Sequence, residues 1–305
     1  MTDKNTDFHQ NNLLNKGDGS DLSCGGIMNR KTTININGLL MDFSTPKVMG
    51  ILNLTPDSFY DGGKYNNEVD SLKQTELMIS EGADFIDVGA YSSRPNAKNI
   101  SLTEELNRIK PIIKSLIREF PEVKISVDTF RAEVAEAAIG EGAVLINDIS
   151  GGELDQEMFK TVAKLKVPYI LMHMKGSPQT MVNESHYTNI VSEVTQYFLK
   201  KIKDLRSLGV LDIIIDPGFG FAKTPNQSFE LLNNLNLLKI LEVPILAGLS
   251  RKSMIYKSLN ISPENALNGT TAANTIALLK GANMLRVHDV KPALEAIQLV
   301  KKLNP

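Results

Sequence analysis

Short apolar runs alternate with longer amphipathic stretches along most of the chain, and this alternation predicts the fold. Each run is rich in β-branched residues and is followed by a polar turn. The eight runs cover residues 48–54, 84–90, 123–129, 143–150, 168–174, 211–217, 244–250 and 283–289. Strands that alternate with helices predict a parallel sheet built from βαβ units.

The stretches between the runs have the spacing of helices, as residues 102–120 and 192–208 illustrate. In the second stretch the apolar residues Val194, Phe198, Ile202 and Leu205 fall close to the helical period. Eight strand–helix units favour closure into a (β/α)₈ TIM barrel, with an open doubly wound sheet as the alternative. Residues 32–43 alternate around Asn37-Gly38, which predicts an N-terminal β-hairpin that could plug the bottom of the barrel.

The first thirty residues differ from the rest of the chain. They are polar, rich in Asn, Asp and Gly, and show no hydrophobic period or signal-peptide core. We therefore expect residues 1–30 to be a disordered extension, with residues left over from expression as the alternative. No low-complexity linker interrupts residues 31–303, so residues 31–305 are expected to form one catalytic domain.

Composition and charge argue against several classes of partner. The chain has 305 residues and a formal net charge of −2, which gives no electrostatic reason to expect nucleic acid or an anionic membrane. No apolar run approaches the roughly 20 residues that a membrane helix needs. Cys24 is the single cysteine, so an internal disulfide or a cysteine-built metal site cannot form, and a cytoplasmic location is expected.

Polar residues gather where the apolar runs end. In a parallel barrel these ends open on one face, which is where barrel enzymes place their chemistry. Turn preferences explain Asn or Asp at one strand end, but not a set that also contains Lys, Arg and His. The set predicts a site for a small polar ligand. Its members are Asn53, Asp87, Asp128, Asn147, Asp148, His173, Asp216, Ser250, Arg251, Lys252, Arg286 and His288, of which His173 is expected to be a core group outside the reaction.

Three connecting segments have compositions suited to ligand binding. Residues 53–63 carry two aromatic side chains and two carboxylates before a glycine pair, as lid loops do. Residues 89–97 offer two hydroxyls and an arginine beside a proline. Residues 216–221 combine two glycines with two phenylalanines, which supply apolar surface for a flat ring. The chain has no P-loop, GxGxxG or HExxH motif, so a Walker ATPase, a Rossmann oxidoreductase and a zinc site lack support.

Eight motifs in order resemble the signatures of the dihydropteroate synthase family. They are MGILNLTPDSFYDGG (49–63), DVGAYSSRP (87–95), SVDT (126–129), IND (146–148), MHM (172–174), DPGFGF (216–221), GLSRKS (248–253) and RVHD (286–289). The likeness covers residues 33–303, with Tyr91, Ser93 and Asn96 where the family often shows Glu, Thr and Gly.

The resemblance implies a folate-biosynthesis transferase. Such an enzyme condenses 6-hydroxymethyl-7,8-dihydropterin pyrophosphate with p-aminobenzoate by an SN1-like substitution, giving 7,8-dihydropteroate and pyrophosphate. The resemblance also implies a Mg²⁺ cofactor, a homodimer and inhibition by sulfonamides.

The resemblance further assigns residues to each ligand. Pterin contacts fall to Asp128, Asn147, Asp216 and Lys252, and pyrophosphate contacts to Asn53, Arg94, Arg286 and His288. The metal falls to Asn53, with Asp57 or Asp61 as a further ligand. The p-aminobenzoate pocket falls to Phe59, Ser93, Pro95, Phe221 and Ser253. The expected catalytic set is Asn53, Asp57, Asp61, Lys252, Arg286 and His288.

Two other functions fit part of the pattern. A methyltetrahydrofolate-dependent methyltransferase has a similar barrel and a similar Asp/Asn pattern, but would have no use for Arg94, Arg286 and His288 around a pyrophosphate. A pterin-binding module without catalysis would not need Asn53, Lys252 and the same Arg–His pair. Release of pyrophosphate in the presence of both substrates separates these alternatives from a synthase.

Overall fold

The computed structural model of the protein describes residues 33–54, 64–91, 99–177, 180 and 184–303. The barrel lies within the compact unit Lys31–Pro305. The expected disorder of residues 1–30 lies outside the described residues.

Eight parallel strands within the described residues form a closed ring. They pair in the order β8-β7-β6-β5-β4-β3-β10-β9, and a parallel bridge between Ile215 and Ile245 joins β8 to the segment that enters β9. The predicted TIM barrel is therefore confirmed, and the open sheet is wrong. The strands are β3 (Lys47–Asn53), β4 (Phe85–Gly89), β5 (Ile125–Asp128), β6 (Leu145–Asp148), β7 (Tyr169–Met172), β8 (Ile213–Asp216), β9 (Leu246–Ala247) and β10 (Met284–Val287).

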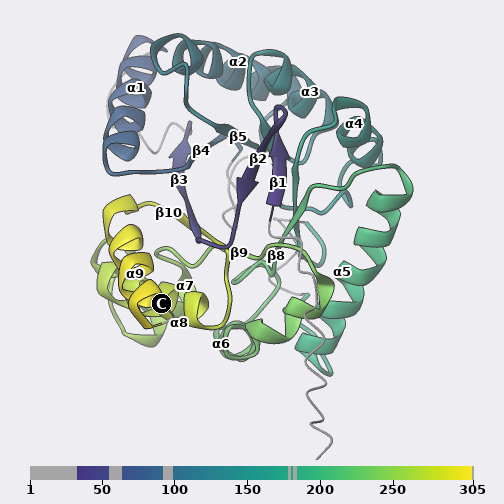
Figure 1. The fold of residues 1–305 in the computed structure, drawn as a ribbon, viewed down its shortest axis with the longest axis vertical. Helices are drawn as coiled ribbons and strands as arrows, with labels where there is room; N and C mark the ends of the chain where they lie inside the picture. The colour runs from purple at the N-terminus through teal and green to yellow at the C-terminus, as the bar shows by residue number, and fades with distance from the viewer. Residues whose placement is uncertain (1–32, 55–63, 92–98, 178–179, 181–183, 304–305) are drawn as a thin grey trace, which may run out of the picture. The chain divides into compact units, whose positions relative to one another are not determined.

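Helices surround the strands, as Figure 1 shows for the view down the ring. In α5, the four residues at the predicted spacing, Val194 to Leu205, are buried against the sheet. Local capping fixes the start of α2, where the Ser101 hydroxyl accepts from Glu104 N at 3.1 Å. The helices are α1 (Lys64–Ser80), α2 (Leu102–Glu119), α3 (Ala132–Gly140), α4 (Met158–Leu165), α5 (Ile190–Ser207), α6 (Pro225–Asn233), η3 (Leu235–Leu241), α7 (Ser253–Ser258), η4 (Pro263–Asn265), α8 (Leu267–Leu279) and α9 (Val290–Leu303).

The predicted hairpin is present and closes one end of the barrel. Strands β1 (Thr33–Ile36) and β2 (Leu39–Asp42) pair antiparallel across Asn37-Gly38, both of which have positive φ, as a two-residue hairpin turn requires. Ile34 and Ile36 are buried among residues from the amino-terminal ends of the barrel strands, including Met49 and Phe85. The hairpin crosses the centre of the ring in Figure 1. The opposite end of the barrel, formed by the carboxyl ends of the strands, is where the polar strand-end residues lie.

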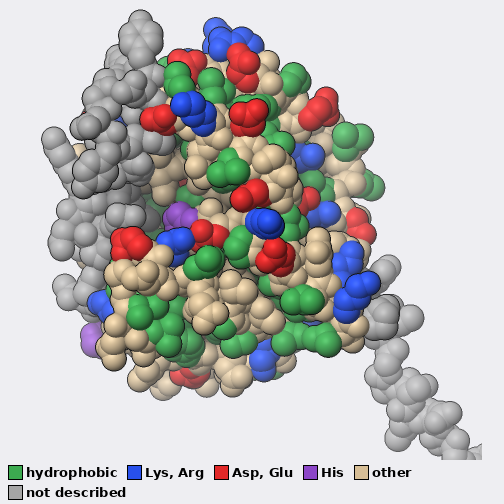
Figure 2. Space-filling view, turned by 90° about the vertical axis from the view of Figure 1, so that its left-hand side faces the viewer, with side chains coloured by type: hydrophobic (Ala, Val, Ile, Leu, Met, Phe, Trp, Pro, Cys, Tyr) green, Lys and Arg blue, Asp and Glu red, His purple; other side chains and the backbone are tan. Residues whose placement is uncertain are grey.

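Two further observations bear on the partners of the protein. Acidic and basic side chains are interspersed over the face shown in Figure 2. Among the described residues, none of the helices combines the length and the apolar character needed to cross a membrane.

Candidate active site

Arg286 joins two carboxylates from neighbouring strands, Asp87 in the middle of β4 and Asp128 at the end of β5. From β10, its Nε donates to Asp87 Oδ2 at 2.6 Å and its Nη2 donates to Asp128 Oδ2 at 2.7 Å. Asn147 Nδ2, in β6, donates to the same oxygen of Asp87 at 2.9 Å. We call Asp87, Asp128 and Arg286 the arginine cluster. One cation is thus held by two carboxylates in a largely buried setting.

Burial governs the ionisation of this cluster. Burial raises the pKa of Asp128 to about 7, and the Arg286 guanidinium offsets this effect only in part. Burial also opposes the charge of Arg286, but Asp87 and Asp128 outweigh it and raise the pKa of that guanidinium. Arg286 therefore stays charged, whereas Asp128 can exchange a proton near neutral pH.

Asp216 and Lys252 face each other across the barrel seam between β8 and β9. A Cβ atom placed on Gly248 would lie 3.7 Å from Asp216 Oδ2 and 3.8 Å from Lys252 Nζ, so both groups border the same space. Lys252 Nζ donates to Phe219 O at 2.5 Å and lies 4.7 Å from the centre of the Phe221 ring. Burial lowers the pKa of Lys252 to about 8, against the opposing effect of Asp216. Burial raises the pKa of Asp216, against the opposing effect of Lys252.

A second lysine holds the turn that follows β8. Lys223 is 7% exposed, and its Nζ lies 3.0 Å from Gly218 O and 2.9 Å from Phe221 O. It also lies 2.9 Å from His173 Nδ1. Burial lowers the pKa of His173 to about 2, so the ring is neutral and its Nδ1 accepts from Lys223 Nζ. Burial also lowers the pKa of Lys223 well below its usual value. We call Asp216, Lys223 and Lys252 the lysine cluster.

The turn itself has an unusual backbone. Gly218, Gly220 and Ala222 all have positive φ, and a Cβ atom at Gly218 would lie 2.1 Å from His173 O. Gly218 N donates to Asp216 Oδ1 at 2.8 Å, which fixes the carboxylate at the strand end. The two glycines of the motif are thus explained by conformation and close approach, as the sequence suggested.

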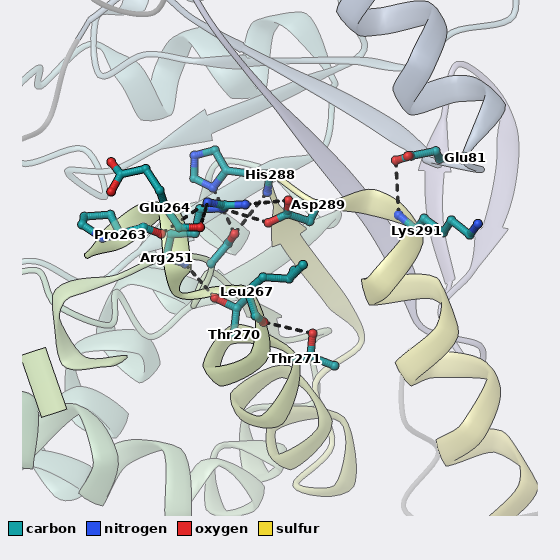
Figure 3. A network of polar contacts seen from close by, with 11 residues as sticks. Glu81, Arg251, Pro263, Glu264, Leu267, Thr270, Thr271, His288, Asp289 and Lys291 are labelled. Carbon is teal, nitrogen blue, oxygen red and sulfur yellow. Dashed lines mark hydrogen bonds and ion pairs between the residues drawn. The ribbon is translucent and has the colours of Figure 1, made fainter. Parts of the chain in front are cut away.

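A separate ion pair fastens the loops after β9 and β10 to each other. Arg251 donates through Nε and Nη2 to the two oxygens of Asp289, and through Nη1 to Glu264 O at 2.9 Å (Figure 3). Ser250 Oγ lies 3.0 Å from His288 Nδ1. These contacts explain why Arg251, although next to Lys252 in the sequence, serves as a loop anchor, while His288 is held at the exposed rim.

Apolar side chains lie beside the charged groups. Ile149, Met172, Met174 and Ala222 form a small buried cluster against which Phe130 and Phe221 pack. Tyr91, two residues after β4, meets Phe130 edge-on with ring centres 5.0 Å apart. Such surfaces suit flat aromatic ligands.

The structure brings together a large part of the predicted site. Asp128, Asn147, Asp216 and Arg286 lie at or next to the carboxyl ends of the barrel strands, Phe221 and Lys252 lie in the segments that follow β8 and β9, and Asn53 ends β3, with Ser253 at the start of α7 and His288 after β10. Asp57, Phe59, Asp61, Ser93, Arg94 and Pro95 lie outside the described residues.

One residue of the site, Lys223, was missed by the sequence analysis, and another, Asp87, was placed at the barrel mouth but assigned to no ligand. Asp87 interrupts a buried apolar strand, and a carboxylate in such a run was a usable signal of a role in the site. Lys223 follows two aromatic residues and an alanine, and nothing in that context distinguishes it from a surface lysine.

The match to known proteins spans the barrel. A family model described as pterin binding enzyme matches residues 49–288. The dihydropteroate synthase of Escherichia coli K12 is 42% identical over 266 residues, which cover 87% of this chain and 94% of the relative. The chain belongs to the dihydropteroate synthase family.

Solved structures of other dihydropteroate synthases share the fold. The Yersinia pestis enzyme, solved in a complex with a sulfonamide drug, is 39% identical with a TM-score of 0.84, covering 89% of this chain and 99% of the other. The Xanthomonas albilineans enzyme, solved with 7,8-dihydropteroate, is 35% identical with a TM-score of 0.80, covering 89% and 98%.

Proposed function

We propose that this chain catalyses the dihydropteroate synthase reaction. The C–O bond of 6-hydroxymethyl-7,8-dihydropterin pyrophosphate breaks, pyrophosphate leaves, and the p-aminobenzoate nitrogen forms the new C–N bond and loses a proton. The observation that carries the proposal is the meeting of acceptor groups (Asp128, Asp216), a cation (Lys252) and a guanidinium (Arg286) at one end of a barrel of this family.

The lysine cluster suits the polar edge of a pterin. The 2-amino and ring N–H groups of that edge are donors, and an ionised carboxylate such as Asp216 only accepts. Lys252, across the same space, would donate to the pterin carbonyl. Asp128 and Asn147, opposite each other in the register of β5 and β6, would contact the neighbouring ring positions.

The pyrophosphate would meet Arg286 and the rim. The two carboxylate contacts of Arg286 use two of the five N–H donors that a guanidinium carries. Its other donors, with those of His288, Asn53 and Arg94, would bind phosphate oxygens. Charge-assisted contacts of this kind strengthen as negative charge builds up on the departing group.

Mg²⁺ fits this arrangement as a metal held largely by the substrate. Asn53 offers a half-buried amide oxygen at the end of β3, and the described residues contain no group of three or more His, Cys, Asp or Glu side chains. Mg²⁺ commonly takes one or two protein ligands and completes its shell with phosphates and water. Asn53 and either Asp57 or Asp61 would hold the ion, which would neutralise charge on the pyrophosphate.

Positioning and electrostatics would account for the rate. The pterin ring can delocalise the positive charge left when pyrophosphate departs, so the substitution is SN1-like and needs no nucleophilic side chain. Asp128 would stabilise that charge, and the apolar cluster beside Phe221 would hold the aniline ring in line.

The p-aminobenzoate pocket would combine Phe221 and Ser253 with Phe59, Ser93 and Pro95. A sulfonamide presents the same aniline ring, so it should compete with p-aminobenzoate. Its longer substituent reaches the rim, where bulk added at Ser93 would disfavour the drug more than the substrate, and Phe59→Leu would weaken both. Inhibition kinetics with sulfamethoxazole test this, and a noncompetitive pattern against p-aminobenzoate contradicts it.

We also propose a cytoplasmic homodimer. Supporting a dimer, Ile276 and Leu279 on α8 and Leu299 on α9 are exposed apolar side chains. Light scattering at several protein concentrations tests the assembly.

Pyrophosphate release tests the proposed reaction. Purified protein with Mg²⁺ should release pyrophosphate and form 7,8-dihydropteroate only when both substrates are present. A binding module would bind the pterin without release, and a methyltransferase would instead consume methyltetrahydrofolate.

A further inference from the structure

Asp87 lies one layer below the strand-end groups. It is fully buried in the middle of β4, with Ile51 and Ser126 as its register partners in the neighbouring strands. The strand ends Asn53 and Asp128 lie two residues further along, opposite Gly89. Because strand side chains repeat every second residue, the Asp87 carboxylate sits beneath the groups that would touch the substrates.

One oxygen of Asp87 serves two residues with different proposed ligands. Asp87 Oδ2 accepts from Arg286 Nε at 2.6 Å and from Asn147 Nδ2 at 2.9 Å. Arg286 is proposed to bind the pyrophosphate, and Asn147 the pterin. A single atom therefore fixes the orientation of a group on each side of the bond that breaks.

The charge balance ties Arg286 firmly to this atom. A buried carboxylate is costly unless a partner compensates it, and the cation that compensates Asp87 is Arg286. The other oxygen, Oδ1, is buried and has no hydrogen-bond partner among the described residues. Moving Arg286 away would therefore leave the buried Asp87 carboxylate without a compensating cation. We therefore expect the guanidinium to bind a phosphate without leaving its present position.

We propose that Asp87 is a positioning residue, which presets Arg286 and Asn147 for the pterin pyrophosphate without touching it. This role rests on the proposed function, because it takes the pyrophosphate as the ligand of Arg286. It separates Asp87 from Asp128, whose carboxylate lies at the strand end and is itself placed to meet the substrate.

Binding of two ligands isolates the pyrophosphate contribution. Calorimetry with Mg²⁺ gives Kd for 6-hydroxymethyl-7,8-dihydropterin and for its pyrophosphate, and the ratio of the two constants measures what the pyrophosphate adds. In Asp87→Asn the amide oxygen can still accept from Asn147, but the charge facing Arg286 is lost. The ratio should fall about tenfold, the scale of a lost charged hydrogen bond. Asp87→Ala, which also frees Asn147, should in addition weaken the unphosphorylated pterin.

A double-mutant comparison tests whether Asp87 acts through Arg286. In an Arg286→Gln background, Asp87→Asn should change the ratio less than about twofold, because the group that it positions is gone. An undiminished tenfold effect in that background would overturn the proposal. Asp87→Glu keeps the charge but displaces the oxygen, so it should also lower the ratio. This variant replaces Asp87→Asn in the test if Asp87→Asn does not fold.

Asp148→Asn is the matched control. Asp148 is another fully buried carboxylate, at the end of β6, but it accepts from Tyr169 Oη, Ser150 N and Gly152 N rather than from a substrate-facing group. Its loss should lower Tm while the ratio stays within about twofold. If Asp148→Asn lowered the ratio as much as Asp87→Asn does, the effect would come from a general loss of stability, and the proposal would be overturned.

The failures of the two proposals differ. A wild-type protein that does not prefer the pyrophosphate form would overturn the proposed function and this role together. A wild-type preference that Asp87→Asn leaves intact would overturn this role alone.

Discussion

The arginine cluster, from β4, β5 and β10, and the lysine cluster, from β8 and the segments after β8 and β9, share one barrel mouth and have opposite compositions. In the first, one cation, Arg286, faces two carboxylates. In the second, one carboxylate, Asp216, has two lysines near it, Lys223 and Lys252. Each cluster thus carries one ionisable group beyond a matched pair, an acid in the arginine cluster and a base in the lysine cluster, and burial lowers the pKa of Lys223 well below its usual value.

This difference shows how a site can be prepared for a ligand with both donor and acceptor edges. In each cluster burial shifts the pKa of an ionisable group that borders the ligand space: it raises the pKa of Asp128 to about 7 and lowers that of Lys252 to about 8. A bound pterin that donates to one and accepts from the other would satisfy both. In the free protein Asp128 and Lys252 already have the positions that would contact the pterin, because the backbone fixes the residues around them.

Asp216→Asn should break the lysine cluster most strongly. The amide oxygen can still accept from Gly218 N, so the turn should persist, but the pterin donors would face a group that also donates. We expect pterin binding to weaken by about 2–4 kcal/mol, as for a charged hydrogen bond lost in a buried site. Calorimetric titration measures this, and unchanged affinity would remove Asp216 from the site.

Replacing each lysine by methionine should separate their two roles. Lys223→Met leaves the carbonyls of Gly218 and Phe221 without their donor, so the free energy of unfolding should fall by about 2–3 kcal/mol. Lys252→Met should cost less stability and more pterin affinity. Urea denaturation and calorimetry on both variants test the contrast, which equal effects on both quantities would contradict.

Pterin affinity should have a maximum between pH 7 and 8, because the groups that limit it titrate there. Below pH 7 Asp128 takes up a proton and stops acting as a pure acceptor. Above pH 8 Lys252 loses the proton that it would donate. Each limb should approach about 1.4 kcal/mol per pH unit.

The variants of these two residues assign the limbs. Asp128→Asn should remove the acid limb and Lys252→Met the alkaline limb, after correction for the titration of the ligand itself. A profile that stays flat from pH 6 to 9 in the wild type would contradict the assignment.

Gly248→Ala should have the smallest effect on pterin affinity among these variants, and it tests whether Asp216 and Lys252 share one ligand space. The added methyl would stand in ordinary contact distance of both Asp216 and Lys252, so the fold should tolerate it while the ligand space shrinks. We expect about 1 kcal/mol of lost pterin affinity. Gly140→Ala is the control, because an added methyl there would meet open space. Gly209→Ala would not serve, because Gly209 has a positive φ that alanine adopts only under strain.

The sequence predicted the positions of these groups better than their partners. Asp128, Asp216 and Arg286 were predicted to share one face because parallel strands end together in a barrel. Their pairing depends on how side chains meet across the ring, and Arg286 and Asp87 are 199 residues apart. Arg251 illustrates the limit, since its positive φ and its pair with Asp289 direct it away from Lys252, its neighbour in the sequence.

The way the ring closes has a consequence for the stability of the barrel between catalytic cycles. Strand β9 has two residues, and an isolated bridge, Ile215 to Ile245, joins the residue that precedes it to β8. Opening fluctuations should concentrate at this short joint, where amide hydrogens would exchange with solvent soonest among the strands. Asp216 and Lys252 flank the joint, so a pterin held between them would act as an added rung. The substrate would then lengthen the lifetime of the closed barrel as well as occupy it.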